Sequence, residues 1–155
     1  EDTAQTLHDR LAQLAPAATE EALDLLERRR AIRIPQDPTR ATYAKKLKKE
    51  DGRIHWDQPQ RAVDRHIRAM NPWPGAYTFI ASPEGPRLLK IFSTILSNRA
   101  EGKPGEVLRT DEHGILVACG QGGLLLREVQ LPGKRRLHAA EFLRGHDLPV
   151  GTVLS

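Results

Sequence analysis

The stretch RLLKIFSTIL (residues 87–96) indicates most clearly how this chain folds, because apolar and polar side chains alternate along much of it. Alternation with a period of two is typical of a β-strand with one buried face. Leu89, Ile91 and Ile95 are expected on the buried face. A two-residue period does not suit a helix, so this segment predicts a β domain around it.

Four more apolar segments surround that stretch, and they are residues 76–82, 106–110, 115–119 and 124–131. Turns rich in glycine and proline separate all five, as expected for short antiparallel strands. Residues 138–144 predict one short helix and residues 150–154 a final strand. Five or six strands with a small helix describe a compact barrel or sandwich.

The region before the strands is helical and then irregular. Residues 3–14 predict a helix, and Pro16 is expected to end it and to open a second one. This short, acidic helical pair buries too little surface to form a domain, so it is expected to pack against another part of a larger protein. A connector follows, and residues 59–70 predict a third helix.

Composition restricts the function further. Residues 1–27 carry a net charge of −6, whereas residues 28–75 carry thirteen Lys and Arg against five acids, or +8. A basic block of this density suggests a polyanion partner, although a solvated linker is the alternative. No apolar run approaches the length of a transmembrane helix and the first residues do not resemble a secretory signal, so we expect a cytoplasmic protein without a membrane partner.

The reactive side chains do not assemble a recognisable active site. Cys119 lies in an apolar strand, which favours a small buried residue over a nucleophile. The histidines lack metal-ligand spacing, so no metal is expected. Residues 120–123, Gly-Gln-Gly-Gly, precede a strand and lack the Lys-Ser/Thr of a phosphate-binding loop, which favours a hairpin turn.

Two tryptophans and two basic clusters remain. Trp56 and Trp73 are candidates for stacking on unpaired bases. The prolines beside Trp73 favour a packing role instead, in which it caps the barrel and holds the third helix. The basic clusters are Lys45, Lys46, Lys48, Lys49 and Arg53 in the connector and Lys134, Arg135 and Arg136 after the fifth strand. Together with a small barrel they favour nucleic-acid binding.

Several stretches resemble methionyl-tRNA formyltransferases in the order of that family. The longest is ATYAKKLKKEDGRI (residues 41–54), followed by Trp56. The other stretches are IRA (residues 67–69), NPWPGA (residues 71–76), PGKR (residues 132–135) and FLRG (residues 142–145), and residues 2–9 resemble the end of the catalytic domain. The resemblance covers nearly the whole chain.

The resemblance implies a cytoplasmic, monomeric enzyme that moves a formyl group from 10-formyltetrahydrofolate to methionine on initiator tRNA. The family's catalytic Asn, His and Asp lie in the earlier part of its Rossmann-like domain, which includes a His-x-Ser-Leu-Leu-Pro segment that does not occur here. The resemblance therefore implies no catalytic residue and no bound cofactor in this chain, which alone would be inactive. Its partners would be initiator methionyl-tRNA and the N-terminal catalytic domain.

For the fold, the resemblance implies an α+β fragment: a helical pair, an extended basic linker and a mainly antiparallel β-barrel like the OB-fold. The expected divisions are residues 1–30 as the end of a Rossmann-like catalytic domain, 31–58 as linker and 59–155 as barrel. The expected tRNA contacts are Lys45, Lys46, Lys48, Lys49 and Arg53, with Lys134, Arg135, Arg136 and Arg144 as weaker candidates. The alternatives are the barrel of another folate-dependent formyltransferase and a non-catalytic protein-interaction module.

Overall fold

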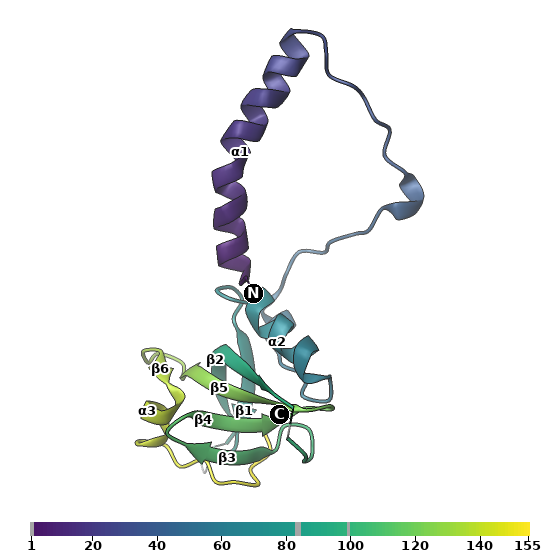
Figure 1. Ribbon diagram of the computed structural model, residues 1–155. Coiled ribbons are helices and arrows are strands. Elements are labelled where there is room, and N and C mark those ends of the chain that lie inside the picture. Colours follow the sequence, from purple (N-terminus) through teal and green to yellow (C-terminus); the bar gives the residue numbers. More distant parts are fainter. Residues whose placement is uncertain (1, 83–84, 99) are drawn as a thin grey trace. The chain divides into compact units, whose positions relative to one another are not determined.

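The computed structural model describes residues 2–82, 85–98 and 100–155 (Figure 1). The chain forms two compact units, one ending at Leu47 and the other comprising Lys48–Ser155. The boundary lies inside the lysine-rich segment. The second unit therefore includes Lys48 and Lys49, whereas Lys45 and Lys46 belong to the first.

The first unit contains one long helix, α1 (Ala4–Glu27), and a short 3₁₀ turn, η1 (Pro38–Arg40). Thr3 begins α1, because its Oγ1 accepts a hydrogen bond from the backbone N–H of Thr6 at 3.2 Å. None of the residues of α1 is buried, and its leucines are exposed. Within the unit, the apolar face of this helix has nothing to pack against.

The expected break at Pro16 is wrong, because α1 continues through the proline. Proline lacks an N–H, so this turn loses one backbone hydrogen bond, which costs about 3 kcal/mol in a helix interior. Alanines on both sides of Pro16 are the strongest helix formers. Thr19 Oγ1 also donates to the backbone oxygen of Ala15 at 2.7 Å. The predicted helical pair is therefore a single helix.

The second unit is built on an antiparallel sheet in the order β1-β2-β5-β4-β3, with β6 paired to β5. Its strands are β1 (Ala76–Ile80), β2 (Arg87–Ser97), β3 (Val107–Asp111), β4 (Gly114–Ala118), β5 (Gly123–Gln130) and β6 (Leu137–His138). The five predicted strands are thus confirmed to within a few residues. The sequence did not predict β6, which has only two residues.

Residues 152–155 connect the two edges of this sheet. The Phe79 N–H in β1 donates to the Ser155 oxygen at 2.8 Å, and the Val107 N–H in β3 donates to the Thr152 oxygen at 2.8 Å. The segment therefore satisfies backbone groups on both edge strands. This arrangement supports the predicted α+β, barrel-like domain.

Two helices and a 3₁₀ turn accompany the sheet: α2 (Gln60–Ala69), α3 (Ala139–Leu143) and η2 (Lys49–Gly52). Val63 and Ile67 from α2 and Phe142 from α3 are buried in the same apolar cluster as the inward side chains of the strands. Figure 1 shows α2 and α3 on different sides of the sheet. The short helix expected at residues 138–144 is confirmed as α3.

One side chain of the opening stretch faces the opposite way from its prediction. Leu89 and Ile91 are fully buried, as expected, but Ile95 is 50% exposed. The pairing of β2 with β5 shifts register on both sides of Ser93. Such a bulge inserts an extra residue and moves the following side chains to the other face. The alternation alone does not reveal a bulge.

Candidate nucleic-acid surface

The first basic cluster extends across the boundary between the two units, and all five of its side chains are exposed. In the second unit, the Lys48 N–H donates to an Asp51 carboxylate oxygen at 2.8 Å, which stabilises the η2 turn. Arg53 follows this turn, and its guanidinium carbon lies 5.9 Å from the centre of the Phe79 ring. Lys48, Lys49 and Arg53 are therefore attached to the sheet domain by a defined turn.

The second basic cluster lies in the turn between β5 and β6, and Arg144, the remaining predicted contact, lies at the end of α3. Lys134, Arg135, Arg136 and Arg144 are all exposed. Arg135 is paired with Glu141, whereas Arg136 lies 3.5 Å from the Glu128 carboxylate and 3.7 Å from the centre of the Phe92 ring. Nearby acids therefore offset part of the charge of this cluster.

The structure reverses the expected roles of the two tryptophans. Trp56 is 5% exposed, and its Nε1 donates to Thr78 Oγ1 at 3.0 Å. Trp73 is 54% exposed, so the prediction that it caps the barrel is wrong. Prolines on both sides restrict the backbone around Trp73, but they do not bury its ring.

His66 on α2 faces the turn that carries the first basic cluster. Its Nε2 atom is buried and has no hydrogen-bond partner among the described residues. Burial lowers the pKa of His66, with a smaller lowering from the charge of His55, while the backbone of Gly52 and Arg53 and the charge of Asp51 act in the opposite direction. The neutral imidazole is therefore the form that this packing favours.

The lowered pKa of His66 predicts that the second unit loses stability in mild acid. A histidine with a folded-state pKa below its unfolded value contributes full stability above about pH 6.5. That contribution falls as the pH drops through 6.5, because the unfolded chain binds the proton more readily. Urea unfolding at pH 7.5 and pH 5.5 measures this loss. His66→Phe should show a smaller loss between these pH values, whereas an equal loss in both proteins would contradict the assignment.

In the described ranges, neither the single cysteine nor any group of metal-ligating side chains suits the chemistry considered in the sequence analysis. Burial raises the pKa of the Cys119 thiol to about 12, so little thiolate forms at neutral pH. The prediction that Cys119 is a small buried residue is confirmed by its 4% exposure. Residues 2–82, 85–98 and 100–155 contain no group of His, Cys, Asp and Glu that suits a metal ion. Residues 119–122 connect β4 to the antiparallel β5, which agrees with the hairpin turn predicted at residues 120–123.

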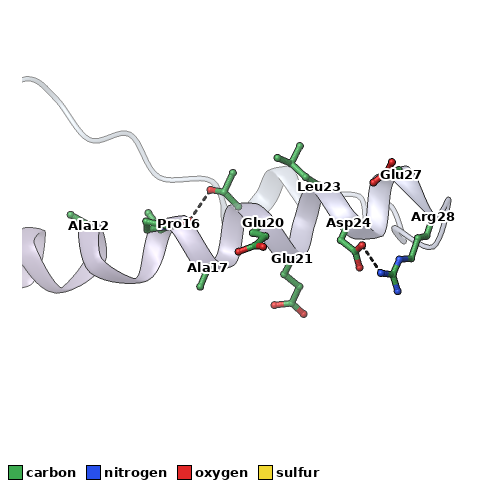
Figure 2. Close-up of a pocket in the computed structure, with 11 residues that line it drawn as sticks. Ala12, Pro16, Ala17, Glu20, Glu21, Leu23, Asp24, Glu27 and Arg28 are labelled. Carbon is green, nitrogen blue, oxygen red and sulfur yellow. Dashed lines mark hydrogen bonds and ion pairs between the residues drawn. The ribbon is translucent and has the colours of Figure 1, made fainter.

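A hollow on α1 does not alter this conclusion. Figure 2 shows its eleven lining residues, which lie between Ala12 and Arg28 on α1 and its C-cap. One exposed helix lines all of it, so it is not an enclosed cavity. Four of the residues are acids, which disfavours phosphate: Glu20, Glu21, Asp24 and Glu27.

Comparison with known proteins identifies the domain. The model of the family described as the formyl transferase C-terminal domain matches residues 46–147, well over half of the chain. The chain belongs to this family. The match begins within the first basic cluster and continues through α3, so the formyl transferase C-terminal domain contains the sheet and both of its helices.

Curated relatives agree with this assignment. A methionyl-tRNA formyltransferase of Methylacidiphilum infernorum is 53% identical over 99% of this chain and 48% of its own length. One from Geobacter sulfurreducens is 44% identical over 99% of this chain and 47% of its own length. The chain therefore spans about half the length of the curated relatives it matches.

Solved structures support the same fold. HypX from Aquifex aeolicus in complex with tetrahydrofolic acid has a TM-score of 0.58 and 24% identity, over 81% of this chain and 22% of its own. A variant of the same HypX has a TM-score of 0.58 and 26% identity, over 83% of this chain and 23% of its own.

Among the described residues, no helix has the length and apolar composition needed to cross a membrane.

Proposed function

We propose that this chain is the tRNA-holding part of a methionyl-tRNA formyltransferase, an enzyme that formylates methionine on initiator tRNA with 10-formyltetrahydrofolate. The observation that carries the proposal is the first basic cluster, which is exposed, lysine-rich and attached by η2 to a formyl transferase C-terminal domain. Each lysine placed at a phosphate releases a condensed counterion. The relatives at 53% and 44% identity carry the name of this enzyme.

In this proposal, binding and chemistry are divided between parts of the whole enzyme. The chain binds the tRNA body through phosphates, which fixes position without reading sequence. Formyl transfer and folate binding take place in another part of the enzyme, so the chain alone is inactive. The enzyme acts as a monomer in the cytoplasm, where translation begins.

We also propose the divisions of the chain. Residues 1–30 end a Rossmann-like catalytic domain, residues 31–58 form the linker and residues 59–155 form the barrel. The support comes from α1, which has no buried residue and exposes Leu11 and Leu14 by 58% and 65%. Leucines at helical spacing usually face a partner, and burial of each side chain would stabilise the contact by about 1.5–3 kcal/mol. Part of the whole enzyme outside this chain would supply that partner.

Changing Lys45, Lys46, Lys48 and Lys49 to alanine tests the proposal. Fluorescence anisotropy with labelled initiator tRNA at about 50 and about 200 mM salt measures affinity and its salt dependence, with duplex DNA as competitor. We expect weaker binding and a salt slope that falls by roughly 0.7–0.9 for each lost phosphate contact.

A charge-conserving control separates charge from shape. Changing the same four lysines to arginine keeps the charge and should keep both the affinity and the salt slope. Unchanged affinity and slope in the alanine variant would reject the linker assignment.

Formyl-transfer assays of the whole enzyme with different acceptors then separate this function from that of another folate-dependent formyltransferase. No affinity for any polyanion would favour a protein-interaction module.

A further inference from the structure

The outward face of β1 carries two aromatic side chains beside two cations, and of these four residues only Arg53 is among the predicted tRNA contacts. Along β1, Ala76, Thr78 and Ile80 are buried, while Tyr77 and Phe79 between them are partly exposed. Adjacent residues of a strand point to opposite faces, so the two rings lie on the outer face. We name Arg53, Trp73, Tyr77, Phe79 and Lys90 the β1 aromatic surface.

Contacts in the structure join four members of this surface. The Tyr77 and Phe79 rings meet edge to face, with centres 5.7 Å apart and planes at 83°. Arg53 lies over Phe79 at 5.9 Å and pairs with Tyr77 through a parallel bridge. Tyr77 is also directly opposite Lys90 in the pairing of β1 with β2. Two aromatic rings are therefore flanked by two cations on one face of the sheet.

Trp73 lies in the turn next to this group. The Gly75 N–H donates to the Met70 oxygen at 2.8 Å, which closes the turn. A Cβ atom built on Gly75 would lie 3.4 Å from the Lys90 amine, and one built on Gly52 would lie 2.3 Å from the Gly75 oxygen. The Trp73 turn is therefore in contact with both Lys90 and the end of η2.

The charges on the segments next to the Trp73 turn favour an anionic ligand. Lys48, Lys49 and Arg53 lie on or beside η2, and Lys90 lies under the turn. The η2 turn itself carries two acids, Glu50 and Asp51, and Asp51 accepts a hydrogen bond from the Lys48 backbone. The cations named on η2, beside it and under the Trp73 turn therefore outnumber the acids of η2.

We propose that the β1 aromatic surface binds unpaired nucleotides of RNA, with Trp73 stacking on a base and the neighbouring cations contacting its phosphates. Stacking needs a free face of both ring and base, and Trp73 with 54% exposure has one. A duplex hides its base faces, so this surface discriminates unpaired from paired RNA. The inference rests on the proposed function and adds to it the kind of nucleotide that this part of the chain holds.

The test measures binding of the full chain to a fluorescein-labelled, non-self-complementary RNA of about 12 nucleotides, near the upper end of the site sizes known for such domains. Trp73→Ala should weaken binding roughly 5- to 150-fold, the range that alanine substitution gives for one stacked base. Trp73→Phe keeps a stacking ring and should retain most of the affinity. Ile95→Ala, which removes an equally exposed apolar side chain from β2, should have no effect.

Two further readouts separate stacking from altered folding. The thermal midpoint of Trp73→Ala should match that of the unchanged chain, because the ring is exposed. RNA should also quench the tryptophan fluorescence of the unchanged chain but not that of Trp73→Phe, whose remaining tryptophan, Trp56, is buried. Quenching that persists in Trp73→Phe would place the base elsewhere and overturn the inference.

The outcomes also distinguish this inference from the proposed function. If the four lysine-to-alanine changes weaken RNA binding while Trp73→Ala does not, the phosphate surface stands and the stacking surface is rejected. If Trp73→Ala weakens duplex and single-stranded RNA equally, base stacking is rejected as well. If the unchanged chain binds neither RNA nor tRNA at about 50 mM salt, both proposals fall.

Discussion

Trp56→Ala is expected to lower the free energy of unfolding of the second unit by about 3–5 kcal/mol, the range measured for buried tryptophan or phenylalanine. The ring is 5% exposed and belongs to the apolar core cluster. Its removal leaves a cavity, and it also removes the hydrogen bond from Nε1 to Thr78 Oγ1. Urea unfolding monitored by circular dichroism measures the change.

Trp73→Ala is the matched control, because it makes the same substitution at a ring that is 54% exposed. A surface substitution of this kind usually changes stability by no more than about 0.5 kcal/mol. Equal losses for Trp56→Ala and Trp73→Ala would contradict the structure. If only Trp73→Ala lowers the free energy of unfolding strongly, Trp73 has the packing role that the sequence favours.

Gly114→Ala is expected to destabilise the β3–β4 hairpin by roughly 2–6 kcal/mol, from backbone strain and overpacking together. Gly114 has a φ of +137°, a conformation that side chains other than glycine rarely adopt. A Cβ atom there would also lie 2.2 Å from the backbone oxygen of Leu126 in β5. That oxygen belongs to a central strand and cannot move without disturbing its pairing.

Gly133→Ala separates the two causes of this loss. Gly133 also has a positive φ, +70°, but nothing lies within 4 Å of the position of its Cβ. Only the conformational penalty remains there, about 1–2 kcal/mol. Thermal or urea unfolding of both variants makes the comparison. If Gly114→Ala lowers the free energy of unfolding by no more than Gly133→Ala does, Gly114 does not approach β5 as closely as the structure shows.

The strands were predictable because their local pattern is strong. Residues 87–96 alternate, turn residues bound each apolar segment, and the structure forms β2 over Arg87–Ser97. The helix at Ala139–Leu143 was also predictable from its local sequence. The predicted break at Pro16 is wrong because it counts only the free-energy cost of one proline in a helix. It leaves out the high helix propensity of the alanines beside that proline.

The candidate site was predictable in part. The lysine cluster can be recognised directly in the sequence. A run of lysines is expected to be exposed, and this expectation requires no knowledge of tertiary contacts. The β1 aromatic surface was missed, although Tyr77 and Phe79 alternate with Ala76, Thr78 and Ile80. That alternation predicts a shared face. It does not tell which cations the folded chain brings to that face, because Arg53 and Lys90 come from other segments.

Local sequence is enough to recognise the short antiparallel strands, the basic segment and the family resemblance, because each depends on residues that are neighbours in the chain. The burial of one tryptophan and not the other depends on the folded chain. The prolines beside Trp73 favour a packing role for that residue, and the polar neighbours of Trp56 do not predict its burial. Their exposures of 5% and 54% follow from contacts across the fold. Burial depends on which distant segments cover a side chain, and the segment that carries Trp56 packs into the sheet while the Trp73 turn remains outside it.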